Sequence, residues 1–355
     1  MSSFSKTIST PLGALYGAIT RARLKLYQKG ALPTEETGVP VISVGNITTG
    51  GTGKTPLVEW IARVVARESL LRVCILTRGY GRTNPNERVI VSDGKEILSN
   101  AREGGDEPFL LAEKLRGLAA VVSDADRVAA ARWALKNLGS EVFILDDGFQ
   151  HLRIKRNLDL VTIDATNPFG GGRLLPLGRL REPLKGLKRA DCIIITRADQ
   201  ITEIDALKLE VDRLSGSGLP IILSRTRVKG LRPLSPSMLD EEIAIDSFLQ
   251  PVAAFCAIGN PQAFFSQLSG AGCNLVYTKA FADHHKYSQA DIDALINRAG
   301  ERGAQALLTT EKDAVKLGSL RFNLPCYVVE IELEFDDEAR LLTMIREAIS
   351  SCIKK

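Results

Sequence analysis

The stretch that most constrains the fold of this chain is residues 41–55, VISVGNITTGGTGKT. An apolar run passes into a glycine-rich segment, and Lys54 and Thr55 then open a segment of helical character. A strand, a glycine-rich turn and a helix in this order are typical of a phosphate-binding loop, in which backbone N–H groups and the helix N-terminus face an anion. We therefore expect Lys54 to contact a nucleotide phosphate and the Thr55 hydroxyl to bind Mg²⁺.

One position in this loop departs from the general motif, which has glycine where this sequence has Thr48. A glycine-rich hairpin that contains GKT by chance is the alternative interpretation, but it leaves the order of strand, loop and helix unexplained. The residues predicted to bind the nucleotide are Thr48, Thr49, Gly50, Gly51, Thr52, Gly53, Lys54 and Thr55.

The charge of the chain is informative mainly through its distribution. A net charge of +4 over 355 residues is too small to indicate nucleic-acid binding. Residues 1–30 contain no acidic residue, and residues 12–27 place apolar side chains at nearly helical spacing with basic side chains on another face. This amphipathic helix either packs on the protein or lies on an anionic lipid surface. No apolar run reaches the roughly 18 residues that a spanning helix requires.

Apolar runs alternate with helical segments after the loop, which predicts a doubly wound, mostly parallel α/β sheet of the P-loop NTPase type. The expected strands of this first unit are residues 72–77, 88–91, 120–123, 142–146, 158–163 and 192–196. Ligands of such sheets bind at the carboxyl ends of the strands.

The glycine- and serine-rich residues 215–218 and the proline-bearing residues 232–236 suggest a boundary or hinge. We expect a basic amphipathic helix over residues 1–38, a nucleotide-binding core over residues 39–225, and a smaller α/β domain over residues 226–355. The expected strands of this second domain are residues 252–258, 274–278, 306–309 and 326–331.

Two carboxylates, Asp146 and Asp147, follow the apolar residues 142–145. An aspartate at the end of a strand beside a phosphate-binding loop can hold Mg²⁺, and we assign that role to Asp146. Asp147 would point to the opposite face if the strand continued. A third carboxylate, Asp106, lies in the sequence GDEP, where it either caps a helix or takes a proton from an acceptor hydroxyl.

The histidine pair His284 and His285 lies in the second unit, with no third histidine or cysteine nearby that would complete a zinc site. A histidine that assists a carboxylate across the cleft is the simpler hypothesis. The segment 170–189 is strongly basic and includes Arg173 and Arg181, which suits a phosphorylated or membrane-bound anionic substrate.

The sequence TRAD at residues 196–199 follows an apolar strand, as a base-binding loop does in P-loop GTPases. It supports an alternative hypothesis, a regulatory GTPase whose second domain binds a partner protein.

Several separated motifs resemble those of the tetraacyldisaccharide 4'-kinase family, which phosphorylates a membrane-embedded glucosamine disaccharide 1-phosphate with ATP and Mg²⁺. The resemblance covers residues 39–316, and the Thr48 variant of the loop is also in that family's style. Its motifs are GNITTGGTGKTP, TRGYGR, GDEP, DDGFQH, LLPLGRLREP, GNP, FADHH and TEKDAVK.

The resemblance implies a role for each matching residue. Asp106 would be the general base toward the sugar 4'-hydroxyl and His284 its partner, with His285 as the alternate. Asp146 and Asp147 would arrange metal and nucleotide beside Gln150, and Arg78 would lie near the phosphates or the acceptor. The resemblance further implies that residues 1–38 form a membrane-association helix, that residues 39–225 form the kinase core, and that residues 226–355 close over the nucleotide cleft. The implied location is the cytoplasmic face of the inner membrane, bound peripherally or monotopically to its anionic surface, with no obligate protein partner.

Overall fold

The computed structural model describes residues 3–235, 243–245 and 248–353, and its strands form one twelve-stranded sheet. The strand order is β10-β9-β11-β12-β8-β7-β6-β1-β5-β2-β4-β3. Pairing is parallel except between β8 and β12 and between β3 and β4. The strands are β1 (Val41–Asn46), β2 (Val73–Thr77), β3 (Val89–Ser92), β4 (Ala119–Ser123), β5 (Val142–Asp146), β6 (Leu158–Asp164), β7 (Cys192–Thr196), β8 (Ile221–Pro233), β9 (Val252–Cys256), β10 (Leu275–Ala280), β11 (Ala306–Thr310) and β12 (Cys326–Phe335). The predicted α/β class with a mostly parallel sheet is confirmed.

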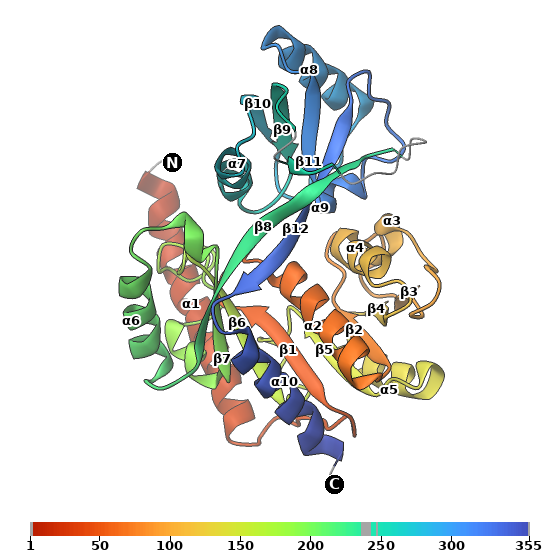
Figure 1. The fold of residues 1–355 in the computed structure, drawn as a ribbon. Coiled ribbons are helices and arrows are strands. Elements are labelled where there is room, and N and C mark those ends of the chain that lie inside the picture. The colour runs from red at the N-terminus through yellow and green to blue at the C-terminus, as the bar shows by residue number, and fades with distance from the viewer. Residues whose placement is uncertain (1–2, 236–242, 246–247, 354–355) are drawn as a thin grey trace.

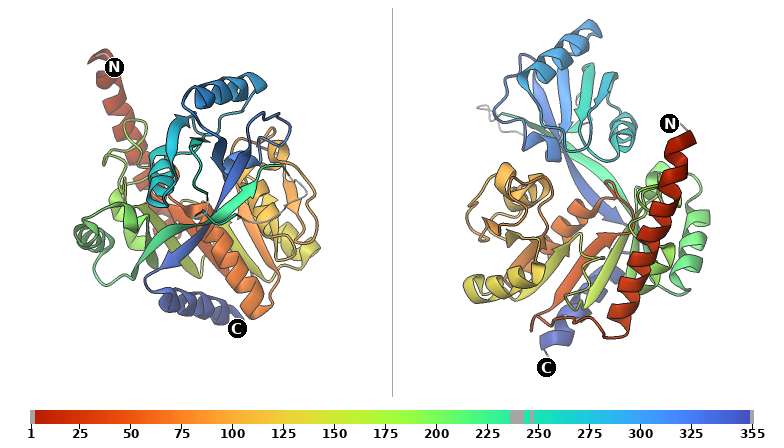
Figure 2. Two further views of the ribbon diagram at one scale, coloured as in Figure 1. Left: turned by 45° about the horizontal axis from the view of Figure 1, so that its top comes forward. Right: turned by 180° about the vertical axis from the view of Figure 1, so that it is seen from behind.

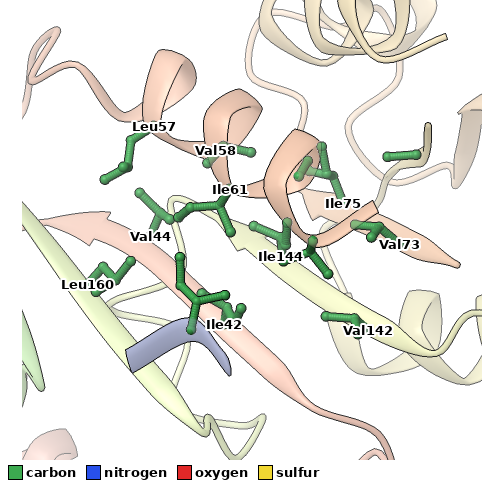
Figure 3. Close-up of a cluster of buried hydrophobic side chains, with 14 of the residues drawn as sticks. Ile42, Val44, Leu57, Val58, Ile61, Val73, Ile75, Val142, Ile144 and Leu160 are labelled. Carbon is green, nitrogen blue, oxygen red and sulfur yellow. The ribbon is translucent and has the colours of Figure 1, made fainter. Parts of the chain in front are cut away.

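Helices cover both faces of the first part of the sheet (Figure 1). Helix α2 packs on β1, β5 and β2 through apolar side chains that include Leu57, Val58 and Ile61 (Figure 3). Burial on both faces explains why β1 and β5 read as nearly continuous apolar runs instead of alternating ones. The helices are α1 (Ser3–Gln28), α2 (Lys54–Ser69), α3 (Ala101–Gly104), α4 (Asp106–Lys114), α5 (Arg127–Leu138), α6 (Ile204–Ser215), α7 (Pro261–Gly270), α8 (Gln289–Glu301), α9 (Glu311–Ala314) and α10 (Glu338–Ile353), with 3₁₀ turns at Leu184–Arg189 and Ala198–Gln200.

The long antiparallel pair of β8 and β12 connects the two halves of the molecule (Figure 1). Beyond it, β9, β10 and β11 carry α7 and α8 on a second apolar core. Strand β8 runs across the boundary expected between residues 225 and 226, and α10 returns to the first half, where it contacts β1 and β6. The exact division into domains therefore stays a prediction.

Sequence reasoning missed β8 and α6. In β8 the exposed side chains of Arg225 and Arg227 form ion pairs with Glu332 and Glu334 of β12, so this strand has a charged face and no long apolar run. Its period-two alternation was the available signal.

Helix α1 lies along the outside of the first half, with its N-terminal end projecting past the sheet (Figure 2). The predicted helix is confirmed and begins earlier than expected. Its inner face is formed by small residues, since a Cβ on Gly13 or Gly17 would touch Leu177 or Leu174, while Leu15 and Ile19 are exposed. Within the described residues, no helix has the length and apolar character needed to cross a membrane.

Candidate active site

The glycine-rich loop joins β1 to α2 in the expected geometry. Gly53 adopts a left-handed conformation (φ 78°) at the position before α2, and Gly50 also has a positive φ (119°). Such values favour glycine. Among the described residues, the amides of Gly50, Gly51, Thr52 and Gly53 donate to no protein group. They remain available to an anion at the N-terminus of α2.

Two threonines of the loop have structural partners. The amide of Thr49 donates to the Arg179 carbonyl at 2.7 Å, so this donor is already used. The Thr52 hydroxyl accepts from Asn46 Nδ2 (2.9 Å) and contacts the Thr162 hydroxyl (2.8 Å), with all three side chains buried or nearly so. These bonds hold the loop against β1 and β6.

Asp146 and Asp147 both reach the loop, because β5 ends at Asp146 and Asp147 turns back with a positive φ of 54°. The alternation that would place Asp147 on the opposite face therefore does not apply. Asp147 lies 3.4 Å from Lys54 Nζ and 2.6 Å from Arg181 Nη1. Asp146 accepts from the Thr77 hydroxyl at 3.0 Å.

The two carboxylates differ in charge state. Burial, and then the charges of Glu107 and Asp147, raise the pKa of Asp146 to about 6. Burial also acts to raise the pKa of Asp147, but Lys54 and Arg181 outweigh it and hold that pKa below its ordinary value. Asp147 therefore stays ionised, because two cations stabilise its charge. The ionised form of Asp146 is disfavoured, and a bound cation would stabilise it.

The structure brings Asp106 and His284 together from the two halves. His284 Nδ1 lies 3.4 Å from Asp106 Oδ2, and His284 has a positive φ of 59°. Gly105, not Asp106, occupies the N-cap of α4, so the capping alternative for Asp106 is not observed. His285 stacks on Phe281 and contacts Asp291, away from Asp106.

Two charged residues here were missed by sequence reasoning, although both lie in quoted motifs. Glu107, of GDEP, and Lys312, of TEKDAVK, form an ion pair of 2.8 Å across the two halves. Lys312 Nζ also lies 3.3 Å from His284 Nε2. Only the tertiary contact separates these residues from other charges in the sequence.

The four candidate substrate residues fall into three groups. Arg78 is exposed at the cavity wall, with its guanidinium over the Tyr80 ring. Arg181 and Gln150 are already engaged, Arg181 with Asp147, and Gln150 with the Asn46 carbonyl (2.7 Å) and Glu182 (2.8 Å). Arg173 is exposed and lies outside the residues that line the two cavities described next.

Two cavities meet at the glycine-rich loop. The larger, of about 1140 Å³, is lined by Lys54, Asp146, His284 and Lys312 and reaches Tyr16 and Ile19 of α1. The other, of about 900 Å³, lies beside Thr48–Thr52 and is lined by Asp199, Asn260 and other polar residues. Residues 49–52 line both cavities, so the loop is common to the two sites.

The described residues include no group of three or more His, Cys, Asp and Glu side chains arranged to hold a metal ion alone. Proteins commonly bind Mg²⁺ through one or two carboxylates together with substrate phosphates. Asp146 is buried and lines the same cavity as Thr55, and these two donors are compatible with that role.

Comparisons with known proteins agree on one family. A family model described as Tetraacyldisaccharide-1-P 4'-kinase (LpxK) matches residues 5–350. A tetraacyldisaccharide 4'-kinase of Desulfotalea psychrophila is 38% identical over 335 residues, 93% of this chain and 94% of that protein. The enzyme of the same name from Halothermothrix orenii is 37% identical over 353 residues, 95% of this chain and 91% of that protein.

A solved structure agrees as well. The crystal structure of "apo" form LpxK from Aquifex aeolicus in complex with ATP superposes with a TM-score of 0.75 at 32% identity, covering 96% of this chain and 98% of that one. The phosphate-binding loop, the facing carboxylates and these full-length matches lead to one conclusion: the chain belongs to the tetraacyldisaccharide-1-P 4'-kinase (LpxK) family.

Proposed function

We propose that this protein is a tetraacyldisaccharide 4'-kinase (EC 2.7.1.130) that transfers the γ-phosphate of ATP to the 4'-hydroxyl of tetraacyldisaccharide 1-phosphate, giving a lipid A precursor. Family membership assigns the reaction. The observation that carries the assignment of roles is the pairing of Asp106 with His284, 3.4 Å apart, beside the cavity that holds Lys54. This kinase supersedes the GTPase hypothesis drawn from residues 196–199.

The reaction is an in-line attack in which Asp106 accepts the proton of the 4'-hydroxyl as it bonds to the γ-phosphorus. Lys54 and the loop amides stabilise the charge on the transferring group. His284 Nδ1 lies 3.4 Å from Asp106 Oδ2, which leaves the other oxygen of Asp106 for the acceptor. Asp147 keeps Lys54 aimed at the phosphates through the 3.4 Å contact.

ATP would place its phosphates on the loop and its nucleoside in the polar cavity beside Thr48–Thr52. Asp199 and Asn260 line that cavity, and the Asn260 side chain is held by Asp164 and Thr166. The solved structure from Aquifex aeolicus, which is in complex with ATP, supports this nucleotide.

Magnesium fits the donors of the site, and Thr55 and Asp146 would hold it. Bound there, the ion would neutralise charge on the β- and γ-phosphates. A divalent cation also explains why a carboxylate with a raised pKa is kept beside Glu107 and Asp147.

The lipid acceptor would enter from the side of α1. Tyr16, Ile19, Thr20 and Arg23 line the larger cavity, so this helix is one wall of the acceptor site. Leu15 and Ile19 are about 60% exposed (57% and 60%) and have basic neighbours, which suits attachment to the anionic cytoplasmic face of the inner membrane. The second half, which supplies His284 and Lys312, would close over the nucleotide.

The deciding experiment is an assay of the purified protein with radiolabelled ATP, Mg²⁺ and tetraacyldisaccharide 1-phosphate in mixed micelles. We expect label in a lipid product that a 4'-phosphatase removes. GTP in place of ATP serves as the control for the alternative. Label released only as inorganic phosphate, or label that depends on GTP, would contradict the proposal.

A further inference from the structure

Lys312 lies on α9 in the second half and contacts α4 of the first half. Its ammonium has three neighbours: Glu107 Oε1 at 2.8 Å, His284 Nε2 at 3.3 Å and Asp283 Oδ1 at 3.6 Å. A lysine ammonium has three N–H donors and no acceptor. The ammonium therefore lies within hydrogen-bond distance of Glu107 and His284 and forms an ion pair with Asp283.

We propose that Lys312 is a positioning residue that fixes the tautomer of His284, so that the Nδ1–H of this ring faces Asp106. The proposal rests on the function proposed above, because it gives the Asp106–His284 pair a catalytic task. Lys312 would act only through His284, because none of its contacts is with Asp106 or with the proposed phosphate site.

The direction of the hydrogen bond follows from the charge of Lys312. Burial acts to lower the pKa of Lys312, but the charges of Glu107 and Asp283 outweigh it and raise that pKa. Lys312 therefore stays an ammonium and can only donate, so His284 Nε2 must accept. Since the hydrogen bond at one ring nitrogen sets which nitrogen carries the proton, the neutral ring has its proton on Nδ1.

The position of Lys312 is rigidly determined by its own segment. Its neighbour Asp313 is fully buried and accepts from the Ala257 amide at 3.0 Å and from the Thr310 hydroxyl at 2.7 Å. The carbonyl of the same Ala257 accepts from the His284 amide at 3.3 Å. Lys312 and His284 are thus anchored to one point at the end of β9.

A second ion pair offers a matched control. Lys114 of α4 contacts Glu311 of α9 at 2.7 Å and Glu59 at 2.9 Å. The pairs Glu107–Lys312 and Lys114–Glu311 therefore join the same two helices with opposite polarity. Of these four residues only Lys312 lies within hydrogen-bond distance of His284, so removing the Glu311 charge weakens the contact between α4 and α9 without changing the partners of the ring.

The test measures which ring nitrogen of His284 carries the proton. Histidine labelled with ¹⁵N in the ring is introduced into the full-length protein, whose three histidines make assignment simple; the signals of His284 are those lost in His284→Gln. Spectra are recorded without ATP or lipid at about pH 8.5, well above the ordinary pKa of free imidazole. The ring ¹⁵N shifts distinguish Nδ1–H from Nε2–H.

We expect Nδ1–H in the wild type and in Glu311→Gln, and a large population of Nε2–H, the commoner form of free histidine, in Lys312→Met. In the assay, Lys312→Met should lower kcat by about tenfold or more and leave the KM for lipid within about twofold. Lys312→Gln, whose amide stops short of the ammonium position, should behave likewise and replaces the Met variant if that one does not fold.

An Nε2–H ring in the wild type would overturn the proposal. So would an unchanged tautomer in the folded Lys312 variants, or an equal change in Glu311→Gln. Because the spectra need no substrate, these outcomes are distinct from failure of the kinase assay, which would instead contradict the proposed function.

Discussion

Arg181 Nη1 lies 2.6 Å from Asp147 Oδ2, while Lys54 Nζ lies 3.4 Å from the other oxygen of the same carboxylate. Asp147 is therefore an anchor between the phosphate-binding lysine and the basic segment that follows β6. Arg181 is also bonded to α1, because the Tyr16 hydroxyl donates a hydrogen bond to the Arg181 carbonyl at 2.9 Å. One carboxylate links the nucleotide side of the site to the proposed membrane helix.

Asp147→Asn should weaken both stability and ATP use, because it leaves Lys54 and Arg181 beside a neutral group. We expect the free energy of unfolding to fall by about 3 kcal/mol, as for other broken buried pairs. The KM for ATP should rise as Lys54 loses its orientation. Urea unfolding and initial rates measure the two effects. Glu141→Gln, which removes an exposed partner of Arg72, is the control and should change stability by less than about 1 kcal/mol.

Asp106→Asn should keep nucleotide binding and lose turnover. An amide cannot accept the proton of the acceptor hydroxyl, so kcat should fall by about 10² to 10⁴. Equilibrium binding of ATP, followed by fluorescence of a labelled analogue, should change less than about threefold. Near-normal turnover would refute the role of Asp106 as base.

Gly259→Ala should weaken ATP binding by displacing the phosphate loop. A Cβ at this position would lie 2.5 Å from the Gly51 amide nitrogen, which is backbone and cannot rotate away. We expect the Kd for ATP to rise by about tenfold or more, as an oriented donor is moved. Gly300→Ala, at a glycine of α8 that lines neither cavity and has nothing within 4 Å of the added atom, is the matched control. Equal affinities in the two variants would show that the loop tolerates the contact.

The pH dependence of stability should reflect His151. Burial, with the charges of Arg127 and Arg153, lowers its pKa from 6.5 to about 3. In the unfolded chain His151 is protonated below about pH 6.5, whereas in the folded protein it stays neutral down to about pH 3. The free energy of unfolding therefore falls as the pH drops from about 6.5 toward 3. At pH 5 the loss should be about 1 to 2 kcal/mol.

His151→Gln should remove this part of the acid loss. The readout is the slope of unfolding free energy between pH 7 and pH 5 in urea, which is insensitive to any constant packing cost. An identical slope in the variant and the wild type would contradict the assignment.

Leu15→Ser with Ile19→Ser should weaken membrane attachment while leaving the fold intact, because both side chains are exposed. Each loses about 1.5 to 3 kcal/mol of apolar transfer free energy, so partition into anionic vesicles should fall at least about tenfold. Leu70→Ser with Leu209→Ser, at leucines outside α1 that are even more exposed, is the control pair for flotation with vesicles. Equal flotation of the two double variants would exclude α1 as the anchor.

Much of the first half could be predicted because its elements are locally encoded. Strands such as β5 and β7 are buried on both faces and appear as short apolar runs between turns. The glycine-rich loop can be recognised in the sequence because the positive φ values of Gly50 and Gly53 favour glycine. Strand β8 was missed because its exposed arginines are paired by glutamates about a hundred residues later in the chain, on β12.

The sequence by itself determined the phosphate-binding loop, the alternation of strands and helices, and the motifs of the family, since each depends on neighbours within one segment. Only the tertiary structure decided that His284, not His285, meets Asp106, and that Asp147 holds Lys54. It also decided that Lys312 completes the histidine's surroundings. These contacts join residues separated by up to about 180 positions, and their geometry depends on how two cores are joined through β8 and β12.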